Sequence, residues 1–225
     1  DEEGKEVIKV DDPTVPVKIT KPSITGASAT KVYDGTGIDV LANVAAEADK
    51  LVTGENKGKN AFVDIIVKVK DEAGKEYTYT IPAGETTGSW SPENTGFKTL
   101  ADVKIVSGVV SDYTYGMTIT FEDATDNGAP KAIENATATY TITKRPVTLT
   151  SETASKSYDG TPLTKPEVTV TDYNDGKNVF DSEFTAAATG TITKPGGPVV
   201  NTITVTPKKD GALESNLSLI HISEP

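Results

Sequence analysis

Residues 31–36 read KVYDGT, and residues 156–161 repeat this motif as KSYDGT. In both copies an Asp–Gly pair follows a tyrosine, and Asp–Gly is typical of a tight turn in which the glycine adopts a positive φ. We therefore interpret both motifs as structural turns whose tyrosine packs over the end of a β-structure, rather than as metal sites built on the two aspartates. The predicted turn residues are Tyr33, Asp34, Gly35 and Thr36 in the first copy and Tyr158, Asp159, Gly160 and Thr161 in the second.

A second match lies upstream of each motif and predicts where one repeat joins the next. Residues 19–22 read ITKP and residues 142–146 read ITKRP, which we interpret as a closing strand followed by a proline joint. Proline fixes φ and pushes the preceding residue towards an extended conformation, so a joint without a Gly/Ser linker is expected to be stiff. The expected domains are the closing strand of a preceding repeat (1–20), a whole repeat with an insert at 37–130 (21–145), a second repeat truncated at its C-terminus (146–216) and a non-native tail (217–225).

Alternating apolar and polar residues predict β-strands along much of the chain. A period of two with one apolar face is typical of a half-buried antiparallel strand, and several such strands separated by turns indicate an all-β sandwich. One stretch differs, because apolar residues at 40–51 recur at helical spacing and predict a short helix that Gly54 ends. The expected strands lie at residues 61–70, 77–81, 115–121, 136–142, 147–150, 168–171, 185–193 and 199–206, and the joint-like segment at 192–198 is interpreted as a loop.

The repeated pattern of a Thr-Lys-x-Pro joint followed by Lys-x-Tyr-Asp-Gly-Thr resembles the YDG and MBG families of bacterial immunoglobulin-like repeats. The resemblance covers the joints, the opening strands and most of residues 146–216, but little of the insert at 37–130. It implies tandem immunoglobulin-like antiparallel β-sandwich modules in a long secreted or wall-anchored protein of the adhesin type. It implies no catalytic residues.

The last nine residues, LSLIHISEP at 217–225, resemble a translated sequencing adapter. We therefore expect the natural chain to have been cut near Asn216 and the second repeat to lack its own closing strand. The alternative is a genuine terminal strand. His221, the one histidine of the sequence, lies within this tail.

Composition excludes several classes of function. With 22 Lys and Arg against 33 Asp and Glu, the formal charge of −11 argues against nucleic acid and anionic membranes as partners. The absence of cysteine excludes disulfides and thiolate chemistry, and a single histidine excludes multi-histidine metal sites. No apolar run reaches the ~18 residues of a membrane span.

Three other features of the sequence are candidates for ligand binding. Residues 172–176 (DYNDG) and 123–128 (DATDNG) echo a calcium-binding loop, but neither has acidic oxygens at the required positions, so ordinary turns are expected. Trp90 lies in the polar segment GSWSP and is a candidate contact for a sugar ring, although a lone tryptophan is more often a packing anchor. We expect no catalytic residue, cofactor or metal.

The sequence therefore predicts a non-catalytic structural module, a stalk segment of a bacterial adhesin-like protein that is extracellular, at the cell surface or in the cell wall. Its expected partners are neighbouring repeats of the same chain. Two alternatives stay open: a module that binds a host or bacterial glycan or protein, and an accessory domain of a secreted carbohydrate-active enzyme.

Overall fold

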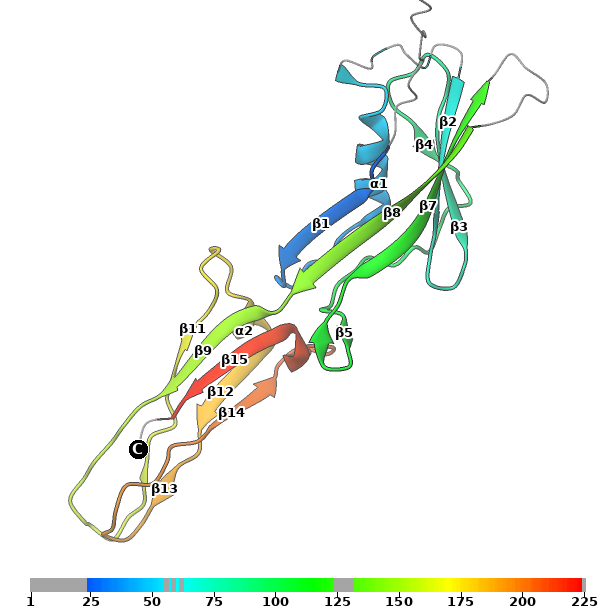
Figure 1. Cartoon of the computed structure of the whole chain (residues 1–225). Coiled ribbons are helices and arrows are strands. Elements are labelled where there is room, and N and C mark those ends of the chain that lie inside the picture. Colours follow the sequence, from blue (N-terminus) through cyan, green and yellow to red (C-terminus); the bar gives the residue numbers. More distant parts are fainter. Residues whose placement is uncertain (1–23, 55–56, 58–59, 61–62, 124–131, 224–225) are drawn as a thin grey trace, which may run out of the picture.

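The computed structural model describes residues 24–223 except 55–56, 58–59, 61–62 and 124–131, and it is mostly β-structure. The predicted closing strand at residues 1–20 and the loop at 124–128 lie outside the described residues. The chain forms two lobes arranged end to end, a first lobe (residues 24–143) and a second lobe (residues 145–223), joined where one long strand passes into the next (Figure 1).

The first lobe is built on one curled, mixed sheet of six strands in the order β1-β8-β7-β2-β3-β4. Within it, β2 pairs with β3 and β7, and β7 pairs with β8, all antiparallel as the alternation predicts. The strands are β1 (Ala27–Val32), β2 (Val63–Lys70), β3 (Glu76–Ile81), β4 (Ser89–Trp90), β7 (Tyr113–Asp123) and β8 (Ala132–Thr143), and a small hairpin adds β5 (Ile105–Val106) and β6 (Val109–Val110).

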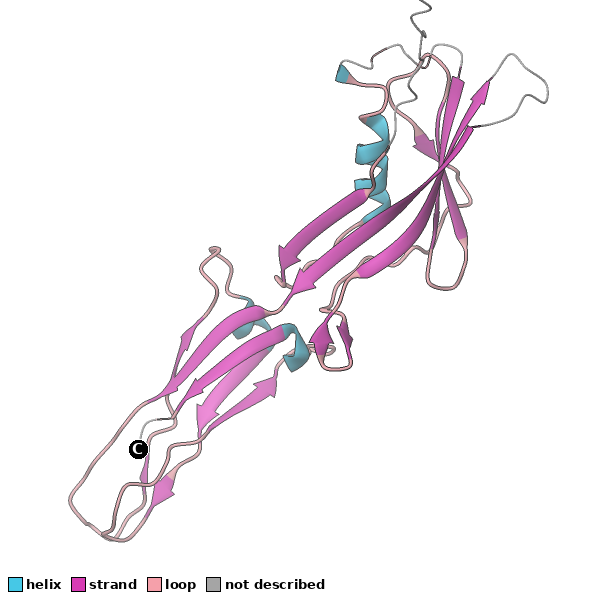
Figure 2. Cartoon of the chain, in the orientation of Figure 1, coloured by secondary structure: helices cyan, strands magenta, loops and turns pink. Residues whose placement is uncertain are grey.

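The helix predicted near residues 40–51 is confirmed as α1 (Val40–Asp49), which lies alongside the first-lobe sheet (Figure 2). Asp39 caps its N-terminus, because its carboxylate accepts a hydrogen bond of 3.0 Å from the Ala42 N–H. The helix ends at Asp49, before the Gly54 that was expected to end it. Its apolar stripe and the inward faces of the strands form one core, which includes Val40, Val44, Ala48, Ile65, Val67, Ile119 and Tyr140.

The second lobe is centred on β9 (Arg145–Ser151), which pairs antiparallel with β11 (Val168–Thr171) and parallel with β15 (Leu217–Ile222). Its core contains Leu149, Phe180, Phe184, Ile203 and Leu217, all buried. The strand expected at 185–193 is broken into two. The other elements are β10 (Leu163–Thr164), α2 (Val179–Glu183), β12 (Phe184–Ala188), β13 (Thr191–Ile192), β14 (Ile203–Pro207) and the 3₁₀ turn η2 (Glu214–Asn216).

Two strand pairs differ from the antiparallel arrangement expected from the sequence, and they match one another. In each lobe the opening strand pairs in parallel with the last strand, β1 with β8 and β9 with β15. Parallel partners end at the same edge of a sheet, so the KVYDGT motif, which begins in the last two residues of β1, lies beside the point where β8 continues into β9. This pairing places the first motif at the joint between the lobes.

The tail at 217–225 contributes β15, so the position expected to lack a closing strand is filled by Leu217–Ile222. Leu217 is buried, but Ile220 and Ile222 are exposed. The tail therefore pairs by its backbone, places Leu217 in the core and packs the partly buried Leu219 against it. Its origin in a sequencing adapter stays a prediction.

Candidate functional site at the joint between the lobes

Arg145 is the centre of the joint and its side chain is fully buried. One residue, Lys144, separates it from the end of β8. Its Nε donates to Asp172 Oδ1 (2.5 Å), and Nη1 and Nη2 donate to the two oxygens of Asp175 (2.9 Å each). Remaining N–H groups donate to the backbone carbonyls of Tyr33 (3.3 Å), Tyr173 (3.2 Å) and Lys177 (2.9 Å). Every nitrogen of the guanidinium therefore has an acceptor.

This arrangement shows what the loop at residues 172–176, which is similar in sequence to a calcium-binding loop, contacts in the structure. Residues 172–177 wrap around a protein cation, and the fork of Arg145 fits the Asp175 carboxylate in the bidentate geometry that such pairs favour. The hydrogen bond from Arg145 holds the pKa of Asp175 at about 2. The same bond to Asp175, together with Asp172, raises the pKa of Arg145 above its ordinary value. Among the residues that the structure describes, no group of three or more metal-ligating side chains is found.

Tyr33 crosses the joint from the first lobe. Its hydroxyl donates to both carboxylate oxygens of Glu183 in α2, at 2.9 and 3.1 Å, and Lys209 lies 3.4 Å from the same carboxylate. Tyr33 and Glu183 are both buried. Burial and this hydrogen bond raise the pKa of Tyr33 to about 12. The phenol therefore stays protonated and keeps donating to Glu183 over the physiological range.

Asp34 is the next contact across the joint. Its Oδ2 pairs with the ammonium of Lys177 in the second lobe, while its Oδ1 accepts hydrogen bonds from the N–H and hydroxyl of Thr36 and pairs with Lys31. Partial burial disfavours the charged carboxylate, but Lys177 and Lys31 hold the pKa of Asp34 well below its ordinary value. One oxygen thus organises the turn and the other holds the second lobe.

A third contact lies on the other side of the joint. The side chain of Asn216, fully buried in η2, accepts a hydrogen bond of 2.8 Å from the Val103 N–H and donates one of 2.8 Å to Asp102 Oδ1. The joint is therefore fixed at several separated points, which a single flexible connection would not provide.

The second copy of the motif repeats the internal geometry of the first. Asp159 Oδ1 accepts from the N–H of Thr161 (2.9 Å) and its hydroxyl (2.8 Å), and it pairs with Lys156 (2.8 Å). Gly35 and Gly160 have φ values of 74° and 81°, which the turn interpretation requires. The two copies differ in their surroundings, because Tyr33 is 5% exposed and Tyr158 is 67% exposed.

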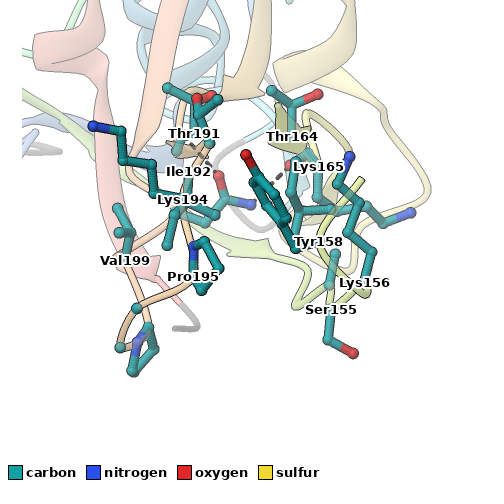
Figure 3. A pocket seen from close by; sticks show the side chains of 18 of the residues that line it. Ser155, Lys156, Tyr158, Thr164, Lys165, Thr191, Ile192, Lys194, Pro195 and Val199 are labelled. Carbon is teal, nitrogen blue, oxygen red and sulfur yellow. Dashed lines mark hydrogen bonds between the residues drawn. The ribbon is translucent and has the colours of Figure 1, made fainter. Parts of the chain in front are cut away.

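A pocket of about 350 Å³ opens beside the second motif (Figure 3). Tyr158 and Lys156 line one side of it, and Ile192, Lys194 and Pro195 line the other. The pocket lies at the end of the second lobe remote from the joint. All of its lining residues belong to the second lobe.

Trp90, the candidate sugar contact, is half-buried. Its ring lies 5.1 Å from that of Tyr79 at an angle of 53°, and its backbone pairs with β3. It also lines a pocket of about 350 Å³ with Asp39, Asn94 and Phe97. The indole therefore packs against Tyr79 and stays partly exposed.

Sequence reasoning identified the two motifs but missed Arg145, Glu183 and Asn216 as parts of a site. The signal for Arg145 was available, because it is the sole arginine of a lysine-rich chain and it stands beside the joint proline. No family model, curated protein or solved structure matches this chain. No helix among the described residues is long and apolar enough to cross a membrane.

Proposed function

We propose that this chain is a non-catalytic spacer, a stiff segment of two immunoglobulin-like modules in a bacterial surface or secreted protein of the adhesin type. The observation that carries the proposal is the buried Arg145, whose guanidinium binds the backbone of one lobe and two carboxylates of the other. A spacer has to keep its modules in line, and a satisfied polar network specifies one arrangement.

The second lobe supports the sandwich part of this proposal. Its β11-β9-β15 sheet and its β12-β14 pair enclose Leu149 and Phe184. The first lobe differs from this sandwich, because α1 rather than a second sheet packs against its sheet. The surface charge also suits a spacer, since a net charge of −11 keeps like modules apart in solution.

Small-angle X-ray scattering tests the proposal. We expect the chain to scatter as one elongated particle with a defined maximum dimension. Replacing residues 144–146 with Gly-Ser-Gly removes Arg145 and the proline, and it should broaden the distribution of interatomic distances while circular dichroism shows that the β-structure persists. An unmodified chain that scatters as a freely hinged pair would remove the basis of the proposal.

A second candidate function, glycan binding, is favoured by the open pocket that contains the exposed ring of Tyr158. A glycan array separates the two functions. Specific hits that disappear with Tyr158→Ala support a binding module, whereas a spacer gives no hits.

A further inference from the structure

The two motif copies are alike inside and differ in what covers them. In the first copy a Cβ at Gly35 would lie 3.3 Å from Glu183 Oε1, whereas at Gly160 nothing lies within 4 Å. The Asp34 side chain is 13% exposed and that of Asp159 is 55% exposed. Both differences arise because the α2 end of the second lobe sits on the first motif.

In the first motif two side-chain groups contact the second lobe, and the same groups of the second motif have no partner among the described residues. Asp34 uses Oδ1 within its turn and Oδ2 for Lys177. Asp159 uses Oδ1 in the same way, but its Oδ2 has no partner among the described residues. The hydroxyl of Tyr158 likewise has no hydrogen-bond partner in the described part of the chain, while that of Tyr33 binds Glu183.

The strand pair beside the second motif, β9 and β15, is arranged like the pair β1 and β8 beside the first motif. β15 runs parallel to β9 and ends beside it, as β8 ends beside β1 before it enters the second lobe. The second motif lies farther from its strand, since residues 152–155 separate it from β9 whereas the first motif begins within β1, and the open pocket lies next to the second motif. A module bound at the second motif would therefore lie farther from the end of β9 than the second lobe lies from the end of β1.

We propose that the KSYDGT motif is a docking surface for a further module of the second-lobe type, which supplies a carboxylate to the Tyr158 hydroxyl and an ammonium to Asp159 Oδ2. Its chemistry is that of Glu183 and Lys177 at the α2 end. This inference rests on the proposed spacer function and adds the atoms that would connect one module to the next.

Zero-length cross-linking tests the contact directly. An extended chain carries residues 1–222 followed by a second copy of residues 144–222. A water-soluble carbodiimide then joins ammonium and carboxylate groups that touch, and mass spectrometry identifies the joined peptides. The Asp34–Lys177 pair of the existing joint is the internal reference. We expect a cross-link of comparable yield between Asp159 and Lys177 of the appended copy.

Two matched variants assign that cross-link. Asp159→Asn in the original copy and Lys177→Arg in the appended copy should each abolish it, and both should leave the Asp34–Lys177 product unchanged. If the reference forms and the Asp159 product does not, the docking inference is wrong and the spacer proposal stands. If neither forms, the spacer proposal fails and the docking inference fails with it.

Nitration by tetranitromethane provides a readout that does not depend on cross-linking. Tyr158 should react readily in the unmodified chain, as its exposure requires, while Tyr33 is protected. In the extended chain one of the two Tyr158 rings should become protected. If both rings stay reactive, whether because the appended copy fails to dock or because it fails to fold, the docking inference is overturned.

Discussion

The fully buried guanidinium of Arg145 balances two carboxylates that are only partly exposed, Asp172 and Asp175. Removing one member of a buried ion pair leaves an uncompensated charge, which costs about 3–5 kcal/mol. We therefore expect Arg145→Ala to lower the free energy of unfolding by about that amount in urea titrations. Arg145→Lys should recover only part of it, because an ammonium cannot form the bidentate fork. Lys144→Ala is the control, and a similar loss there would contradict the assignment.

Tyr33 and Tyr158 form a matched pair, since they occupy the same position in two copies of one motif. Tyr33→Phe removes the donor to the buried Glu183 and should cost about 1–3 kcal/mol, the usual penalty for leaving a buried polar group unsatisfied. Tyr158→Phe should change stability by less than about 0.5 kcal/mol, because its hydroxyl is exposed. Thermal unfolding followed by circular dichroism compares the two, and equal effects would show that the Glu183 bond does not contribute.

The pKa of Asp175 predicts how the joint responds to acid. Arg145 holds this pKa at about 2, below the ~3.9 of an unfolded aspartate, so the folded state favours the ionised form. The stabilisation is therefore complete above ~pH 4 and is lost as the pH falls towards 2. We expect the free energy of unfolding to fall less steeply in this window for Asp175→Asn than for the unmodified chain. Parallel pH profiles would exclude Asp175 as the titrating group.

At the scale of elements, strands with strict alternation were predictable and most contacts between distant segments were not. The apolar faces of β2, β3 and β7 follow from period two, and α1 follows from helical spacing with Asp39 as its cap. The parallel pairing of β1 with β8 could not be predicted, because alternation shows which face of β8 is buried but does not identify its second neighbour beside the antiparallel β7. The five residues of α2 are too few to show a helical period, so Glu183 could not be placed.

Deleting residues 217–225 tests β15 as an element. The strand covers one side of β9 and buries Leu217, so the second lobe should lose stability, while the first lobe, whose six-stranded sheet does not include β15, should keep its melting temperature. Hydrogen exchange distinguishes the lobes, and we expect faster exchange in β9 with unchanged protection in β2 and β7. Unchanged protection of β9 would show that the tail adds nothing to the fold, as expected of an adapter-derived segment.

For the whole molecule, the stiffness predicted from Pro146 rests on more than the proline. Proline restricts two torsions, but it does not fix how one lobe sits against the other. That relation is set by three groups of contacts: the Arg145 network with Tyr33 and Glu183, the Asp34–Lys177 pair, and Asn216 with Val103. None of these pairs is close in sequence, so the sequence alone indicates the proline and does not indicate these contacts.

We propose above all that the two lobes keep one fixed orientation. The chain has no cysteine, so Lys98→Cys and Thr204→Cys place one spin label on an exposed position of each lobe without further changes. Pulsed electron–electron double resonance then measures the distribution of distances between the labels. We expect a single narrow peak in this distribution, no broader than that of a label pair within the second lobe. When residues 144–146 are replaced by Gly-Ser-Gly, the distribution should become much broader. A broad or multiple distribution in the otherwise unmodified chain would contradict it.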